Sequence, residues 1–248
     1  MGTKEPKVKV QNLTKKFGDL LVLNNLNFEV QEGEFLCIVG PTGCGKTTFL
    51  NSLTRLYEPT AGEILVNGIP VNPKKQNISY IFQEYSSFPW LTVEQNIRFG
   101  LEIKKMPKAE ADANVEEMLD IVGLTKFRNY YPSQLSISML QRVAIARAFA
   151  TKPELLLMDE PYGQLDIDLR FKLEDELIKL WQKTGTTVLF ITHNIEEAVY
   201  LSQKIMVLTN KPTSVKTVLD NPLPLPRDVV SPEFVALRNK VTDLIRWW

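Results

Sequence analysis

The feature that most constrains the fold is the stretch GPTGCGKT, which runs from Gly40 to Thr47 of the 248-residue chain. Its spacing, G-x-x-x-x-G-K-[ST], is that of a phosphate-binding loop. An apolar run, FLCIV, precedes it, and the helical pattern KTTFLNSLTRLY begins within it at Lys46. That order aims backbone N–H groups and the start of a helix at an anion. The alternative is a glycine turn with a solvated lysine, which the flanking strand and helix disfavour.

The residue types in this stretch suit a nucleotide phosphate. Gly43 and Gly45 allow the backbone to turn tightly around an anion. Lys46 is expected to reach the β- and γ-phosphates, and Thr47 is expected to give a hydroxyl ligand to Mg²⁺. The predicted nucleotide-binding residues of the loop are Gly40, Pro41, Thr42, Gly43, Cys44, Gly45, Lys46, Thr47 and Thr48.

Short β-rich runs alternate with helical runs along much of the chain. The predicted strands cover residues 8–13, 26–30, 34–40, 62–68, 78–83, 154–161, 186–193 and 204–210, and the predicted helices 46–57, 92–104, 108–124, 138–152, 168–185, 194–202 and 231–248. This alternation favours an α/β fold with a largely parallel sheet covered on both faces. The helical stretch at 84–152 predicts an inserted subdomain, and residues 221–248 predict a connector and a terminal helix.

Two further strands end in residues that suit the same chemistry. ELLLMDEP is an apolar run that ends at Asp159 and Glu160. The carboxyl end of a parallel strand faces the crevice where ligands bind, so Asp159 is expected to hold Mg²⁺ and Glu160 to act as general base on water. His193, the single histidine, follows TTVLFIT and is expected to hydrogen-bond a γ-phosphate or the attacking water. The alternatives are two solvated acids and a satisfied polar histidine.

Charge and cysteine content exclude other classes. The chain has 29 basic and 29 acidic residues, so binding to nucleic acid through bulk positive charge is not expected. No apolar run has the length of a membrane span, and MGTKEPKVKV lacks the apolar region of a secretory signal. The two cysteines, Cys37 and Cys44, have neither metal-ligand spacing nor a disulfide framework, which favours a reducing cytoplasm.

With these motifs in this order, the chain resembles the ATP-binding subunits of ABC transporters over about residues 7–220. The resemblance implies a single ABC ATPase domain, with a RecA-like P-loop NTPase core formed by residues 1–83 and 153–220 and an antiparallel β portion near the N-terminus. It implies that Phe17 stacks on adenine and that Gln83 binds Mg²⁺ and communicates with the membrane subunit. It also implies that His193 is the switch histidine and that Asp166, in YGQLD, lies in a loop at the dimer contact. YSSFPWLTVEQNI resembles the importers of nitrate, sulfonates and taurine.

The stretch LSISMLQR, from Leu135 to Arg142, departs from the family. In the family this helix start contacts ATP bound to the other subunit through its serine, its N–H groups and its dipole. Ser136 and Gln141 fit that role, whereas Ile137 and Ser138 replace two glycines, and Leu140 replaces a commonly polar residue. Glycine permits close approach to an anion and positive φ, which Ile137 disfavours. We therefore expect an impaired contact with the partner's nucleotide. The alternative is an ordinary core helix with Ser136 as its N-cap.

The resemblance implies a cytoplasmic, membrane-peripheral subunit that uses ATP and Mg²⁺, with a second ATPase subunit, permease subunits and, indirectly, an extracytoplasmic solute-binding protein as partners. The altered stretch favours a heterodimer over a homodimer, so that one composite site keeps a normal signature. Other hypotheses remain: a soluble ABC ATPase acting on nucleic acid or ribosomes, a catalytically weak regulatory subunit, an exporter, and a deliberate replacement of the two glycines to reduce activity. The contribution of Trp247 and Trp248 is left open.

Overall fold

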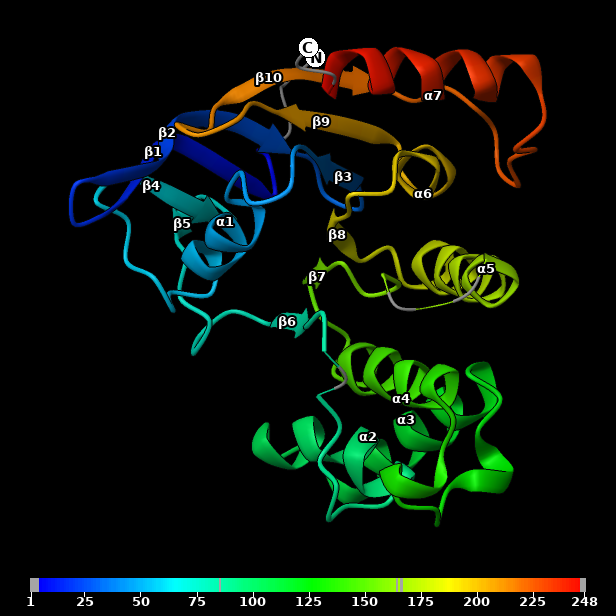
Figure 1. Cartoon of the computed structure of the whole chain (residues 1–248). Coiled ribbons are helices and arrows are strands. Elements are labelled where there is room, and N and C mark those ends of the chain that lie inside the picture. The colour runs from blue at the N-terminus through cyan, green and yellow to red at the C-terminus, as the bar shows by residue number, and fades with distance from the viewer. Residues whose placement is uncertain (1–4, 85, 164, 166, 246–248) are drawn as a thin grey trace. The chain divides into compact units, whose positions relative to one another are not determined.

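The computed structural model describes residues 5–84, 86–163, 165 and 167–245. These residues form two compact units. Figure 1 shows the chain coloured by residue number, from blue at the N-terminus to red at the C-terminus. The first unit contains the chain up to Gln76 together with the chain from Thr187 onward, and the second contains Asn77–Thr186. Asp166, Trp247 and Trp248 lie outside the described residues, so their predicted roles stay predictions.

The first unit has an antiparallel sheet in the order β2-β1-β4-β5. Its strands are β1 (Val8–Phe17), β2 (Leu20–Val30), β4 (Ala61–Val66) and β5 (Ile69–Pro70). In the register of this sheet, Val10 lies opposite Phe28 of β2 and Ile64 of β4. The predicted antiparallel β-rich portion near the N-terminus is therefore present.

The same unit has a second group of strands, in the order β10-β9-β3-β8. They are β3 (Phe35–Val39), β8 (Thr187–Ile191), β9 (Lys204–Leu208) and β10 (Val215–Asp220). β3 pairs in parallel with β8 and β9, and every residue of β3 and β8 is buried. Continuous apolar runs in these strands fit burial on both faces. β10, which the sequence analysis missed, pairs antiparallel with β9.

Three helices complete the first unit: α1 (Lys46–Leu53), α6 (Ile195–Leu201) and α7 (Pro232–Ile245). α1 ends earlier than its apolar spacing predicts, because Thr54 caps it and Arg55 has a φ of 59°. The buried Arg227 donates to the carbonyls of Val199 and Tyr200 at 3.0 and 2.6 Å, at the end of α6. Burial lowers the pKa of Arg227 to about 10, but the guanidinium still keeps its charge near neutral pH. The positive charge of Arg227 therefore stabilises the C-terminal end of α6, which is the negative end of the helix dipole.

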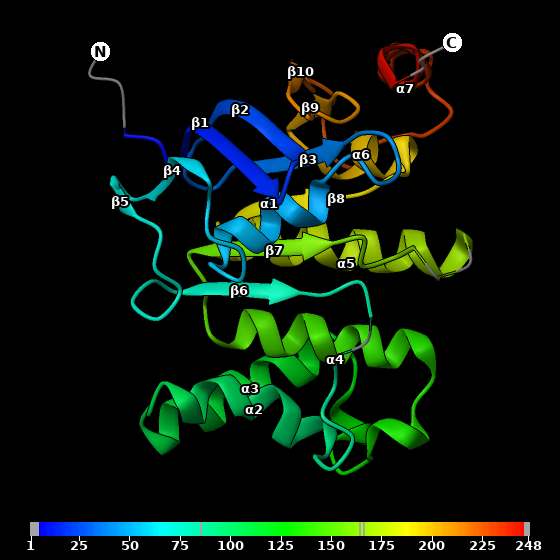
Figure 2. The ribbon, with the colours of Figure 1, turned by 60° about the vertical axis from the view of Figure 1, so that its left-hand side comes forward.

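The second unit is mostly helical, with one parallel pair of strands, β6 (Ile78–Ile81) and β7 (Leu155–Asp159). Its helices are α2 (Val93–Ile103), α3 (Lys108–Ile121), α4 (Ile137–Ala150) and α5 (Ile167–Thr184), with 3₁₀ turns at Thr125–Phe127 and Pro132–Gln134. Helices α2, α3 and α4 pack against one another (Figure 2). The predicted subdomain at 84–152 falls inside this unit, which also contains β6, β7 and α5.

The start of helix α2 follows from its local sequence. The Thr92 hydroxyl caps α2 by accepting from the Gln95 N–H at 3.3 Å, and the Gln95 side chain accepts in return from the Thr92 N–H at 2.9 Å.

In the described part of the chain, no helix has both the length and the apolar content to cross a membrane.

Candidate nucleotide-binding site

The phosphate loop joins the end of β3 to the start of α1, as the sequence predicts. Gly43 and Gly45 have φ values of 73° and 117°, which side chains of L residues rarely adopt. A Cβ placed on Gly45 would lie 2.9 Å from Cγ1 of Val22, and one on Gly40 would lie 3.0 Å from Cβ of Leu208. Glycine is therefore required at Gly45 by both conformation and space.

Lys46 places a positive charge inside this loop. Its side chain is buried, and its ammonium donates to the carbonyls of Gly40 at 3.0 Å and Pro41 at 3.2 Å. The first turn of α1 carries no acid, and its N-cap residue, Gly45, has no side chain to cap it. A buried cation beside an uncapped helix start fits a polyanion, and Thr47 and Thr48 add hydroxyls in the same turn. The residues present therefore fit a nucleotide phosphate.

The loop also contains the buried thiol of Cys44. Burial raises the pKa of Cys44, although Lys46 partly opposes this effect. The thiol therefore stays protonated near neutral pH and adds no negative charge beside the predicted phosphate.

Two other predicted residues of the first unit lie at defined places. Phe17 is 41% exposed at the end of β1, and its ring meets Tyr57 edge to face at 5.2 Å. Lys15 lies 4.9 Å from the centre of the Phe17 ring. His193 is exposed and follows β8, the parallel neighbour of β3, with Ile191 opposite Ile38. His193 and the phosphate loop therefore follow the carboxyl ends of two adjacent strands.

The second unit contains the predicted acids. Asp159 is buried at the end of β7, where Tyr80 of β6 donates to its Oδ2 at 3.2 Å. Burial and the Asp159 carboxylate raise the pKa of Tyr80, so the phenol remains a donor. Gln83 donates to Glu160 at 3.5 Å. The structure thus brings together three predicted site residues, Gln83, Asp159 and Glu160, with Tyr80 as a partner that sequence analysis missed.

Glu160 has an unusual backbone. Its φ is 46°, in the left-handed region where a residue with a side chain is strained. Such strain is common at functional sites. No feature of the sequence indicated it, because the residue follows an otherwise regular apolar strand.

The start of α4 shows what replaces the two glycines. Ser136 is the N-cap and accepts from the Met139 N–H at 3.4 Å, and its hydroxyl lies 3.0 Å from that of Ser138. The N-cap interpretation of Ser136 is therefore confirmed. Ile137 is the first helical residue and is 50% exposed.

Neither Ile137 nor Ser138 has a positive φ, so the preference of glycine for that conformation does not distinguish these positions. The difference from glycine that remains is the bulk of the exposed Ile137 side chain at the helix start. Ser136 and Ile137 are the exposed residues of the stretch, Ser138 is half-buried, and Gln141 is only 1% exposed.

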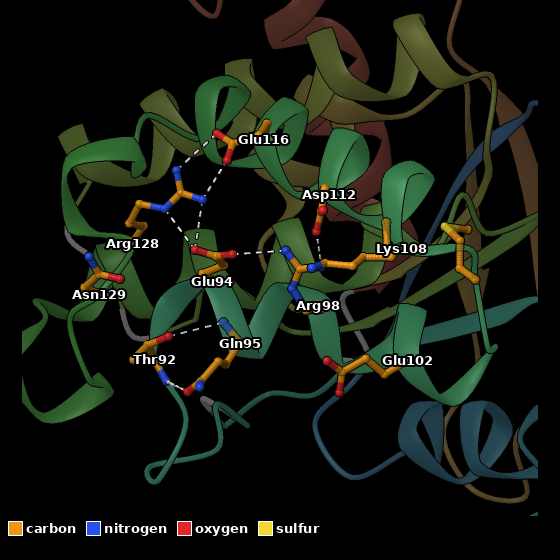
Figure 3. Close-up of a pocket in the computed structure, with 12 residues that line it drawn as sticks. Thr92, Glu94, Gln95, Arg98, Glu102, Lys108, Asp112, Glu116, Arg128 and Asn129 are labelled. Atoms are coloured by element: carbon orange, nitrogen blue, oxygen red, sulfur yellow. Dashed lines mark hydrogen bonds and ion pairs between the residues drawn. The ribbon is translucent and has the colours of Figure 1, made fainter.

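A separate pocket of about 850 Å³ lies between α2 and α3 of the second unit (Figure 3). Glu94 lies at its centre and accepts from Arg98 at 3.0 Å and from Arg128 at 2.9 Å. The two arginines also pair with Asp112 at 2.5 Å and Glu116 at 2.6 Å. Burial raises the pKa of Glu94, but hydrogen bonds from the arginines outweigh it and lower the pKa overall. This network joins α2 to α3 and contains none of the predicted nucleotide-binding residues.

The strand, glycine loop and helix of the first unit define an α/β protein built to hold a nucleotide phosphate. A family model described as ABC transporter matches residues 23–163. An uncharacterized ABC transporter ATP-binding protein of Methanocaldococcus jannaschii is 45% identical over 244 residues, 97% of this chain and 91% of that protein. An aliphatic sulfonates import ATP-binding protein of Bacillus cereus is 42% identical over 228 residues, 92% of this chain and 90% of the relative.

Solved structures agree with this assignment. A dimeric ATP-binding cassette, described in a post-hydrolysis state with ADP and inorganic phosphate, has a TM-score of 0.75 at 34% identity and covers 86% of this chain and 98% of its own. CbiO1 of Clostridium perfringens, part of the ABC transporter complex CbiONQ, has a TM-score of 0.80 at 24% identity over 96% of this chain and 95% of its own, and supports the fold alone.

The chain belongs to the ABC transporter family. Within that family it is an ATP-binding subunit with ATPase chemistry, and the predicted α/β P-loop NTPase fold is confirmed.

Proposed function

We propose that this chain powers import of a small anionic solute, of the sulfonate, nitrate or taurine type, through separate membrane subunits. The observation that carries the ATP-binding part is the phosphate loop, with Gly43 and Gly45 at positive φ around the buried Lys46 ammonium. Importing an anion is supported by the 42% identity to an aliphatic sulfonates import protein.

The residues divide into binding and chemical roles. Lys46 and the loop N–H groups hold the phosphates, and Phe17 stacks on the base. Thr47, Gln83 and Asp159 are the residues that would hold Mg²⁺, which supplies charge neutralisation at the transferred phosphoryl group. Their hydroxyl, amide and carboxylate oxygens are the ligand types that this ion prefers.

Glu160 acts as general base on water, and His193 positions the γ-phosphate. The hydrogen bond from Gln83 to Glu160 links the base to a metal-binding residue within one unit.

The chemical role is tested by Glu160→Gln, which keeps size and removes the base. ATP hydrolysis should fall about 100- to 10,000-fold, whereas the Kd for ATP should change little. Glu176→Gln is the matched control, because Glu176 pairs with Arg142 at 2.8 Å and is not a predicted site residue. Equal hydrolysis by Glu160→Gln and the unchanged chain would remove Glu160 from the mechanism.

We expect two cassettes to form composite sites, each with the phosphate loop of one and the α4 start of the other. A dimeric relative with ADP and inorganic phosphate supports this arrangement. Ile137 at the start of α4 gives this chain a bulky, apolar group where a phosphate would approach. A heterodimer, in which the other subunit supplies a normal signature, is therefore preferred to a homodimer.

The subunit arrangement is tested by purifying the chain alone and with the cassette encoded beside its permease. The heterodimer proposal expects slow hydrolysis by the isolated chain and fast hydrolysis by the pair. Fast, cooperative hydrolysis by the isolated chain would contradict it.

A regulatory subunit with weak catalysis is the second candidate, and the same Ile137 favours it. Transport measured in reconstituted vesicles separates the two, because Glu160→Gln would leave transport unchanged only for a regulatory subunit. Location at the cytoplasmic membrane face is tested by copurification with permease subunits. Copurification with RNA or ribosomes would instead indicate a soluble, non-transport ATPase.

A further inference from the structure

The phosphate loop packs against the connection between β9 and β10, a segment that is far away in the sequence. Thr213 of this connection is fully buried. Its N–H donates to the Val22 carbonyl and its carbonyl accepts from the Asn24 N–H, both at 2.8 Å. These two bonds fix the backbone of Thr213 against β2, within the first unit.

The side chain of Thr213 then contacts the loop itself. Its hydroxyl donates to the carbonyl of Cys44, which is 169 residues away in the chain. A Cβ placed on Gly45 would lie 3.7 Å from the same hydroxyl oxygen. Thr213 therefore lies directly behind the peptide bond between Cys44 and Gly45.

The direction of that peptide bond decides what the loop offers an anion. In a trans peptide the C=O of one residue and the N–H of the next point in opposite directions. The cis peptides among the described residues lie elsewhere, before Pro212 and Pro226. Because Thr213 holds the Cys44 carbonyl on the inner side, the Gly45 N–H points to the opposite side, and no hydrogen bond found among the described residues uses it.

Glycine alone does not fix this direction. Gly45 tolerates φ values of either sign, so the peptide between Cys44 and Gly45 is free to rotate unless something holds its carbonyl. The Thr213 hydroxyl is the side-chain donor that holds it. A reversed peptide would present a carbonyl oxygen to the anion and repel it.

We propose that Thr213 is a positioning residue for phosphate binding, which keeps the Gly45 N–H directed at the nucleotide by holding the Cys44 carbonyl. The inference rests on the proposed function, because it takes the anion to be a nucleotide phosphate. Thr213 itself does not touch the nucleotide.

The test uses the full chain and three substitutions at one site. Thr213→Val removes the hydroxyl at nearly constant volume, whereas Thr213→Ser keeps it. Thr213→Ala has the size of the serine variant without its hydroxyl. Thr187→Val is the matched control, because Thr187 is equally buried and accepts from the Gly33 N–H at 2.9 Å, away from the loop.

Mg-ATP and Mg-ADP are titrated against each variant, and the Gly45 amide is followed by ¹⁵N NMR. Thr213→Val should raise both Kd values about tenfold, consistent with the loss of a buried hydrogen bond, and should shift the Gly45 amide before nucleotide is added. Thr213→Ser should stay close to the unchanged chain, and Thr187→Val should alter neither Kd nor the Gly45 signal.

The outcomes distinguish a failure of the proposed function from a failure of the positioning role of Thr213. If the unchanged chain binds no nucleotide, the proposed function fails. If it binds, and Thr213→Val and Thr213→Ala bind within twofold of it with the Gly45 amide unmoved, the positioning inference is wrong. If the valine variant does not fold, the serine and alanine variants decide, because equal affinities in that pair would overturn the inference.

Discussion

Two helix starts, that of α1 and that of α4, solve the same local problem differently. Each leaves backbone N–H groups without intrahelical partners. At α1, the N-cap residue is Gly45, which has no side chain, and glycines at positive φ bring the chain around a buried lysine. At α4, the Ser136 hydroxyl accepts from the Met139 N–H, and the exposed Ile137 follows.

The difference shows how a helix start becomes available to a ligand. The loop before α1 has Val22 and Leu208 packed close to its glycines, and Thr213 donates to the Cys44 carbonyl. α4 satisfies one of its N–H groups internally and presents an aliphatic side chain to solvent. A helix dipole alone is therefore a weak guide to anion binding, because capping and bulk decide access.

The largest expected effect comes from Lys46→Ala, which removes the cation of the α1 start. ATP affinity should fall about 100-fold or more, since charge-assisted bonds to phosphate are lost. Titration with a fluorescent ATP analogue measures this change. Lys9→Ala is the control, because Lys9 pairs with Glu29 at 3.3 Å on the surface. Unchanged ATP affinity in the Lys46→Ala chain would show that the start of α1 does not bind the nucleotide through this lysine.

A smaller effect is expected from Gly45→Ala. The positive φ and the contact with Val22 at 2.9 Å together should lower the free energy of unfolding by about 2–3 kcal/mol. Gly185→Ala provides the control, because Gly185 has a φ of 64° but no atom within 4 Å of a new Cβ. That variant should cost only about 1 kcal/mol in denaturant unfolding. Equal losses would show that space around Gly45 does not matter.

The α4 start should respond in the opposite direction. Replacing Ile137 and Ser138 together by glycine removes bulk and should raise ATP hydrolysis by the isolated chain about tenfold, if a second copy binds nucleotide there. Steady-state phosphate release measures this rate. Ile167→Gly is a control, since Ile167 is also exposed at the first residue of a helix. No gain from the double variant would mean that Ile137 is not the obstacle.

The smallest effect concerns the cap itself. Ser136→Ala should reduce the free energy of unfolding by about 1 kcal/mol, because the Met139 N–H loses its acceptor. Thr92→Ala, at the start of α2, gives a reference for a cap that lies away from the stretch. A loss in Ser136→Ala far below that of Thr92→Ala would indicate that the 3.4 Å bond contributes little.

Sequence patterns captured the elements that are fixed by local chemistry. The phosphate loop, the buried strands and the Ser136 cap each have a signal within a few residues. β10 was missed because its alternation, VKTVLD, is short and follows a proline-containing turn, and its pairing with β9 depends on tertiary context.

Contacts between distant segments could not be predicted in this way. The bond from Thr213 to Cys44 joins residues 169 positions apart, and Tyr80 meets Asp159 only because β6 pairs in register with β7. The backbone at Ile137 could not be predicted from the family pattern, because α4 already begins at this residue and its φ is not positive.

On the proposed mechanism, the left-handed conformation of Glu160 sets fold stability against catalysis at a single residue. Holding a side chain at a φ of 46° costs about 1–3 kcal/mol, which glycine would largely avoid. Glycine would fit this backbone better, but it would remove the carboxylate that the proposed mechanism uses. If the proposed mechanism holds, a carboxylate kept at this position despite its backbone cost would distinguish relatives that hydrolyse ATP from relatives that only bind it.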